Sequence, residues 1–175
     1  IAGFMMTAAH GDSPAFKIKE NAELPDGNYL RLSVEKYGGM LCAPWLDRPL
    51  SVAGRVLVSE GDKLSVKLVD LKDPCAIIPN VAIHMNRNAN DGMSYNAAVD
   101  MLPVWMSSEK GSFRAAVAKA AGVAEDAIVT GDLFLYDPQK GVTLGEYISA
   151  PRLDDLQCAF SSLTAFFAAG ESRSI

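Results

Sequence analysis

The two histidines of the chain lie beside residues that could form part of a metal site. His10 ends an apolar run and is followed by Gly-Asp-Ser-Pro, which places Asp12 two residues further along an extended segment. Residues two apart in such a segment point to the same side. Imidazole and carboxylate are both zinc ligands, and a nearby carboxylate often orients a ligating histidine. On spacing alone, a zinc ligand and an ordinary histidine at a capped surface turn are equally supported.

Two other positions carry candidate groups for which a structural explanation is stronger on spacing alone. His84 follows the apolar stretch 77–83, where a histidine at the edge of a strand needs no further role. Asp154 precedes a helical pattern, and aspartate is a favoured N-cap residue. Ser13 is not a candidate nucleophile, because nothing in the sequence places a histidine and an acid beside it as a catalytic triad requires.

The composition predicts a packed globular protein of one domain or two small ones. Hydrophobic residues make up 49% and charged residues 21% of the 175 residues. The net charge of -5, without basic clusters, argues against a nucleic-acid partner. Apolar runs fall short of the roughly 20 residues that span a membrane. Cys42, Cys75 and Cys158 are widely spaced, which favours free thiols and a cytoplasmic location.

The residue pattern predicts strands first and a helix last. Residues 3–9 form a continuous apolar run, typical of a strand buried on both faces, and His10 would lie at its carboxyl end, where ligands gather in α/β folds. Further strands are expected at 16–19, 29–34 and 133–136, and a hairpin at 52–58 and 64–69 around a turn at 60–62. Residues 86–96 are rich in Asn, Asp and Gly and predict a loop.

Two helices are expected in the second half of the chain. Ser112 is a suitable N-cap for a helix over 113–121, with Gly122 just beyond its end. Apolar residues at helical spacing run from 156 to 167, with Asp154 and Asp155 at the positive end of that helix. The order of elements predicts an α/β chain, α+β overall, in which a β-rich insertion at 38–147 separates an α/β domain into segments 1–37 and 148–175.

Seven short blocks together resemble one known family. They are residues 8–14 (Ala-Ala-His-Gly-Asp-Ser-Pro), 37–39 (Tyr-Gly-Gly), 45–50 (Trp-Leu-Asp-Arg-Pro-Leu), 53–56 (Ala-Gly-Arg-Val), 78–87 (Ile-Pro-Asn-Val-Ala-Ile-His-Met-Asn-Arg), 132–137 (Asp-Leu-Phe-Leu-Tyr-Asp) and 150–156 (Ala-Pro-Arg-Leu-Asp-Asp-Leu). In sequence and order they resemble the aspartyl aminopeptidase family of di-zinc metallopeptidases. The similarity covers essentially the whole chain, which makes the set far more specific than any one block.

The resemblance implies a fold, a reaction and a role for each candidate residue. The fold would be parts of a three-layer α/β zinc-peptidase domain with an inserted, β-rich dimerisation domain. His10 would bind one of two zinc ions, Asp12 would orient it, and Asp154 would bridge the two ions. His84 would reach from the inserted domain into the active site of a partner subunit and stabilise the oxyanion. The substrates would be peptides with an N-terminal, acidic residue, and the protein would be a homo-oligomer.

The chain also departs from the pattern of that family. The family's site needs a Glu-Glu pair, as general base and ligand, followed by a further Asp and a final His, and this sequence contains no Glu-Glu pair and no third histidine. We therefore expect the chain to be incomplete, to bind zinc weakly and to have no peptidase activity by itself. A non-catalytic dimerisation or binding module, or a degenerate homologue, remains the alternative.

Overall fold

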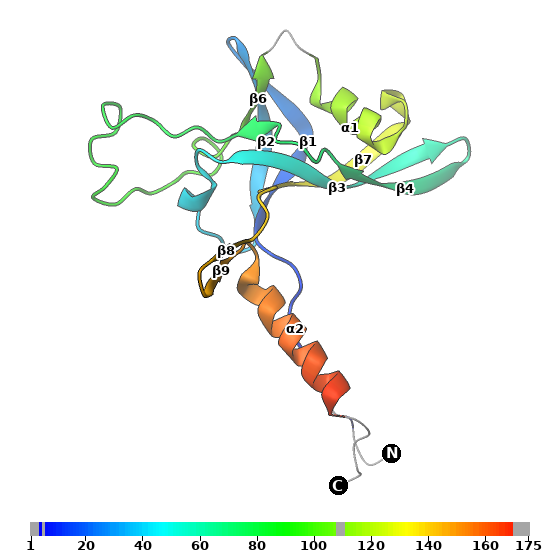
Figure 1. Cartoon of the computed structure of the whole chain (residues 1–175). Coiled ribbons are helices and arrows are strands. Elements are labelled where there is room, and N and C mark those ends of the chain that lie inside the picture. Colours follow the sequence, from blue (N-terminus) through cyan, green and yellow to red (C-terminus); the bar gives the residue numbers. More distant parts are fainter. Residues whose placement is uncertain (1–3, 5, 108–110, 170–175) are drawn as a thin grey trace. The chain divides into compact units, whose positions relative to one another are not determined.

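A computed structural model describes residues 4, 6–107 and 111–169 (Figure 1). These residues divide into two compact units. One unit is Pro14–Pro138, and the other consists of the segments on either side of it, up to Ser13 and from Gln139 onward. The chain is therefore of mixed α/β type, and most of its strands belong to the first unit. The limits of the unit Pro14–Pro138 differ from those of the insertion expected at 38–147. The insertion is defined by its expected role in the whole protein, and its boundaries stay a prediction.

The unit Pro14–Pro138 contains seven strands and one α-helix among its described residues. The strands are β1 (Ala15–Asp26), β2 (Tyr29–Tyr37), β3 (Pro49–Glu60), β4 (Lys63–Asp70), β5 (Ala76–Ile77), β6 (Val104–Ser107) and β7 (Ile128–Tyr136). The helix is α1 (Phe113–Ala121), and two short 3-10 turns are η1 (Ala43–Trp45) and η2 (Glu125–Ala127).

The sheet of this unit closes on itself into a barrel-like structure. Its strand order is β4-β3-β5-β6-β2-β1-β7, and β7 also pairs with β3, so that six strands form a ring and β4 extends from β3 outside it. Successive side chains of a strand point to opposite faces of the sheet, here toward the inside and the outside of the barrel. The inward side chains of β1, β2, β3 and β7 form one hydrophobic core, which includes Phe16, Ile18, Leu30, Leu32, Val34, Val52, Val56, Val58, Leu133 and Leu135.

The local predictions in this unit are confirmed, and the strands are longer than expected. The hairpin of β3 and β4 turns at Gly61 and Asp62, and Gly61 has the positive φ of 66° that such a turn favours. Helix α1 begins after Ser112, whose hydroxyl accepts a hydrogen bond from the Ala115 amide, and ends at Gly122 with a φ of 69°. Residues 86–96 form neither helix nor strand.

The second unit contains the hairpin of β8 (Val142–Leu144) and β9 (Tyr147–Ser149), and helix α2 (Leu153–Ala168). The predicted helix is confirmed, and Phe160 and Phe167 on its apolar stripe are largely exposed.

The predicted buried strand at 3–9 is wrong for its described residues: they form no strand, and Phe4 and Met6 are 81% and 90% exposed. An apolar run forms a buried strand only between neighbouring strands, and no described residue pairs with this one. Gly3 and Met5 lie outside the described residues.

No helix among the described residues is both long and apolar enough to cross a membrane.

Candidate metal centre

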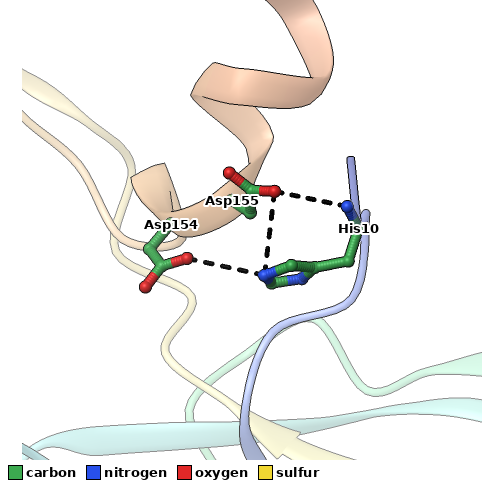
Figure 2. A group of neighbouring side chains, drawn as sticks. All are labelled: His10, Asp154 and Asp155. Atoms are coloured by element: carbon green, nitrogen blue, oxygen red, sulfur yellow. Dashed lines mark hydrogen bonds and ion pairs between the residues drawn. The ribbon is translucent and has the colours of Figure 1, made fainter. Parts of the chain in front are cut away.

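Three side chains from the two ends of the chain meet in the second unit (Figure 2). The Nε2 atom of His10 lies 3.6 Å from Oδ1 of Asp154 and 3.8 Å from Oδ2 of Asp155. The ligand-type atoms of the three residues all lie within 4.8 Å of one another. The backbone amide of His10 also donates a hydrogen bond of 3.2 Å to Oδ2 of Asp155. One nitrogen and two carboxylates therefore surround a single point.

The start of helix α2 presents the two acids to His10. Asp154 and Asp155 have non-helical backbone angles, and the helix becomes regular after them. Arg152, with a φ of 64°, precedes the first residue of α2, and no side-chain hydrogen bond caps the helix there. The capping explanation for Asp154 is therefore wrong, because its carboxylate faces the imidazole of His10. The peptide bond between Asp154 and Asp155 is cis.

Asp12 lies on the other side of the imidazole ring. Nδ1 of His10 is 3.0 Å from the backbone carbonyl oxygen of Asp12 and 3.4 Å from its Oδ1. Both atoms are acceptors, so Nδ1 is the nitrogen that carries the proton in the neutral ring. The lone pair then belongs to Nε2, which faces Asp154 and Asp155. This is the tautomer that a metal ligand with Nε2 needs.

The acidic surroundings change the pKa values of the group. The hydrogen bond to the Asp12 carbonyl raises the pKa of His10 above its usual value, and the charges of Asp155, Asp12 and Asp154 act in the same direction against a desolvation effect. The pKa of Asp155 is lowered, first by a hydrogen bond from the thiol of Cys158 and then by the amide and charge of His10. The same hydrogen bond raises the pKa of the Cys158 thiol. Asp155 is thus held as a carboxylate by donors on two sides.

The donor set and its spacing fit a zinc ion. Zinc binds imidazole nitrogen and carboxylate oxygen at roughly 2.0–2.2 Å, so two ligands of one tetrahedral ion lie roughly 3.4 Å apart. The distances of 3.6 and 3.8 Å from Nε2 to the two carboxylates are close to this separation. Asp155 was not a sequence-predicted ligand. The adjacent pair of acids at the helix start was the available signal, and only the non-helical backbone brings both side chains to one point.

The structure places His84 in the other compact unit. It lies in the exposed loop that follows β5, at a turn between Ile83 and Met85. Val81, Ile83 and Met85 around it are also at least 48% exposed. The structure therefore brings His10, Asp12 and Asp154 together within one unit, and His84 belongs to the barrel-like unit.

The chain is similar to known proteins over its whole length. The family model described as aminopeptidase I zinc metalloprotease (M18) matches residues 1–175. The chain belongs to the M18 family. A probable M18 family aminopeptidase 2 from Clostridium novyi (strain NT) is 43% identical over 172 residues, which cover 92% of this chain and 40% of that protein. The chain spans about 40% of the length of the curated relatives it matches.

Solved M18 structures share the fold of the chain. One chain in the cryo-EM structure of the Ape4 and Nbr1 complex has 29% identity and a TM-score of 0.82, over 94% of this chain and 36% of that one. The structure of the S. cerevesiae mApe1 dodecamer has 27% identity and a TM-score of 0.72, over 95% of this chain and 39% of that one. The relatives are zinc metallopeptidases by family, and the donors at His10, Asp154 and Asp155 are of the kind that zinc binds in such a protein.

Proposed function

We propose that the protein containing this chain is a zinc-dependent aminopeptidase that removes N-terminal residues, preferably acidic ones, from peptides. The observation that carries this proposal is the convergence of His10, Asp154 and Asp155 in a chain that the M18 family model matches from end to end. The two ends of the chain would belong to a three-layer α/β catalytic domain, and residues 38–147 would be the inserted domain.

Each residue of the cluster would have a separate role in binding two zinc ions. When bound, zinc supplies a Lewis acid that lowers the pKa of water and polarises a carbonyl. His10 would bind one ion through Nε2, while Asp12 holds the ring by Nδ1. Asp154 would bridge the two ions, a role that suits a carboxylate whose side chain is 97% exposed. Asp155 would supply a further carboxylate donor, positioned by the hydrogen bond that it accepts from the His10 amide.

His84 would act in the active site of a partner subunit. The exposed loop that carries it is suited to reach another molecule, and a donor aimed at developing negative charge lowers a barrier by a few kcal/mol. A shared site of this kind requires an oligomer. The related mApe1 is a dodecamer, which supports homo-oligomerisation here, and the inserted domain would form the contact. The three free cysteines are in keeping with a cytoplasmic location.

The 175 residues alone offer too few donors for this chemistry. The cluster among the described residues contains three ligand-type side chains, and a catalytic zinc needs about three protein ligands for each ion. We propose that this stretch binds zinc weakly by itself and has no peptidase activity, and that the remaining ligands and the general base belong to other residues of the whole protein.

The test is an aminopeptidase assay on the full-length protein. We expect the purified protein to hydrolyse reporter substrates with N-terminal Asp or Glu faster than one with N-terminal Leu. Removal of metal by a chelator should abolish the activity, and added zinc should restore it. An Asp154→Asn variant should stay inactive at every zinc concentration, whereas Asp91→Asn, in the exposed loop of the barrel-like unit, should match the wild type. Full turnover without metal, or by the Asp154→Asn variant, would overturn the proposal.

A further inference from the structure

Strand β4 forms an open edge of the sheet in the barrel-like unit. It pairs with β3 without a register shift, from Ala53 with Asp70 to Glu60 with Lys63. No other described strand pairs with the far side of β4, because β4 is the last strand in the sheet order. The open edge is therefore free of bulges and eight residues long. Such an edge is a template for pairing with another chain unless charges, a bulge or a proline block it.

The outer face of the β3–β4 hairpin carries a row of aliphatic side chains. Leu64, Val66 and Leu68 alternate along β4, so they point to one face, and they are 62%, 58% and 81% exposed. Leu57 of β3 is the pair of Val66 and extends the row. Val69, on the opposite face of β4, is instead buried in the core. A surface that covered the aliphatic row would remove apolar area from water, which is favourable.

The charged residues of the hairpin leave this edge unprotected. Lys63 and Lys67 point to the face opposite the aliphatic row. Nζ of Lys67 lies 2.9 Å from Oε1 of Glu60, so its charge is paired within the hairpin. Asp70, at the end of the strand, accepts a hydrogen bond of 2.7 Å from the hydroxyl of Tyr136. The middle of the edge therefore presents apolar side chains and unpaired backbone.

The sequence of β4 is complementary to itself about Val66. In an antiparallel pair of two β4 strands centred on this residue, Leu64 of one copy faces Leu68 of the other. Lys67 of one copy then faces Ser65 of the other. A shift of one residue would place the aliphatic rows on opposite faces of the sheet. A shift of two residues in either direction would bring a lysine opposite a lysine, which destabilises a sheet.

We propose that two copies of this chain associate through their β4 strands, which pair antiparallel about Val66 and join the two sheets across a two-fold axis. Main-chain hydrogen bonds along the edge and the shared aliphatic row would hold the contact. The inference rests on the homo-oligomer of the proposed function and identifies one of its contacts. It is separate from the zinc chemistry, because it uses only residues of the barrel-like unit.

This contact differs from the one proposed for His84. In the sheet, β3 lies between β4 and β5, and His84 is in the loop that follows β5. The β3–β4 hairpin and that loop extend from different sides of the barrel-like unit (Figure 1). A two-fold contact joins only two subunits, so a subunit with two different contacts can form an assembly larger than a dimer.

The test measures the mass of the full-length protein by sedimentation velocity at a subunit concentration of about 1 µM. Val66→Lys and Val66→Glu each place like charges opposite each other at the axis, and each should reduce the mass at least roughly twofold. An equal mixture of the two variants places lysine opposite glutamate and should recover the mass of the wild type. Tyr29→Lys and Tyr29→Glu, at an equally exposed position of β2, are the controls and should keep the wild-type mass.

A disulfide across the axis gives a second measurement. Opposite residues of an antiparallel pair have Cα atoms roughly 4.5–5.5 Å apart, within the range that a disulfide spans. Mild oxidation should therefore link Val66→Cys subunits into a covalent dimer on a non-reducing gel. Tyr29→Cys, which keeps the native cysteines Cys42, Cys75 and Cys158, should stay largely unlinked.

The other outcomes overturn the proposal. Unchanged mass in both Val66 variants would show that β4 is not part of a contact between copies. A loss of mass in each variant without recovery in the mixture would show that Val66 faces a different surface. If both charged variants failed to fold, the absence of the Val66→Cys disulfide would decide against the contact.

The two proposals fail separately in these experiments, because sedimentation and cross-linking do not depend on hydrolysis. An inactive protein that assembles through β4 would contradict only the proposed peptidase activity. An active protein whose mass is unchanged by the Val66 substitutions would contradict only this contact.

Discussion

Nε2 of His10 lies 3.6 Å from Oδ1 of Asp154, although nearly the whole chain separates the two residues in sequence. The neighbouring Asp155 accepts a hydrogen bond from the His10 amide, and Asp12 occupies the opposite side of the ring. Asp154 and Asp155 therefore contact His10, and helix capping does not account for these contacts. It also makes the candidate metal centre testable by changes that keep side-chain shape and remove charge.

The first prediction concerns metal affinity. Asp154→Asn replaces one carboxylate by an amide of the same shape, and amides are poor zinc ligands, so zinc affinity of the full-length protein should fall by roughly a factor of 100 or more. Competition with a chelator of known affinity measures the effect. Asp91→Asn removes an exposed carboxylate from the loop 86–96 and should leave zinc affinity unchanged. Equal losses in both variants would indicate a general charge effect.

The second prediction concerns His84 and the partner subunit. His84→Ala should keep zinc affinity and lower kcat, because the proposed role of the imidazole is to stabilise developing charge. Subunits with His84→Ala, mixed with subunits with Asp154→Asn, should regain activity, because a mixed pair holds one intact zinc site that faces one intact His84. With random exchange, about a quarter of the wild-type activity is expected.

Subunit exchange in this experiment is verified with two affinity tags. If tagged subunits exchange and the mixture stays inactive, His84 does not act across the subunit boundary. If His84→Ala alone loses zinc, the residue is a ligand or a structural group and its proposed role is wrong.

The third prediction concerns the stability of the barrel-like unit at low pH. The hydrogen bond from Lys17 lowers the pKa of Asp132, with further contributions from the charges of Lys17 and Arg55. A folded pKa below the unfolded one means that the carboxylate stabilises the fold at pH values above the unfolded pKa. This stabilisation is lost as the pH falls through the folded pKa. Asp132→Asn should therefore cost about 0.5 kcal/mol at neutral pH, a small value because the pair is exposed to solvent.

Urea unfolding of the wild type and of Asp132→Asn at neutral and at acid pH measures the difference in their free energies of unfolding. This difference should shrink toward zero as the pH falls. Asp126→Asn, at an exposed position in η2, serves as the control and should change stability little at either pH. A difference between wild type and Asp132→Asn that grows on acidification would contradict the assigned sign.

The fourth prediction concerns the closure of the barrel. Gly54 on β3 has a φ of 153°, and a Cβ at this position would lie 2.1 Å from the carbonyl oxygen of Asp132 on β7. Gly54→Ala should therefore separate the two strands and destabilise the protein by roughly 3 kcal/mol or more. Gly39→Ala has open space around its Cβ and should be nearly neutral. The midpoints of thermal unfolding compare the Gly54→Ala and Gly39→Ala variants. Similar midpoints would show that separating β3 from β7 at Gly54 does not destabilise the protein.

Local signals account for the parts of the fold that were predictable. Ser112 and Gly122 determine the ends of α1 through bonds and angles within a few residues, and the hairpin of β3 and β4 follows from alternation around one turn. The closure of the barrel depends on the pairing of β3 with β7, which are far apart in sequence and which no local pattern connects. The strand expected at residues 3–9 illustrates the same limit, because apolar residues need a partner to form a ladder.

The candidate site was predictable to a similar extent. His10 and Asp12 are two residues apart, so their proximity could be inferred from the sequence, and the resemblance to a known family added Asp154. Asp155 was missed because a regular helix would direct consecutive residues about 100° apart. The non-helical backbone at Asp154 and Asp155 removes that separation, and residue type alone does not reveal it.

The most direct measurement of the central claim is anomalous X-ray scattering at the zinc edge from crystals of the full-length protein grown with zinc. The account predicts a zinc peak roughly 2.0–2.2 Å from Nε2 of His10 and from a carboxylate oxygen of Asp154, with Asp155 beside it. A zinc peak bound by other residues, with His10 and Asp154 joined only to each other, would contradict it.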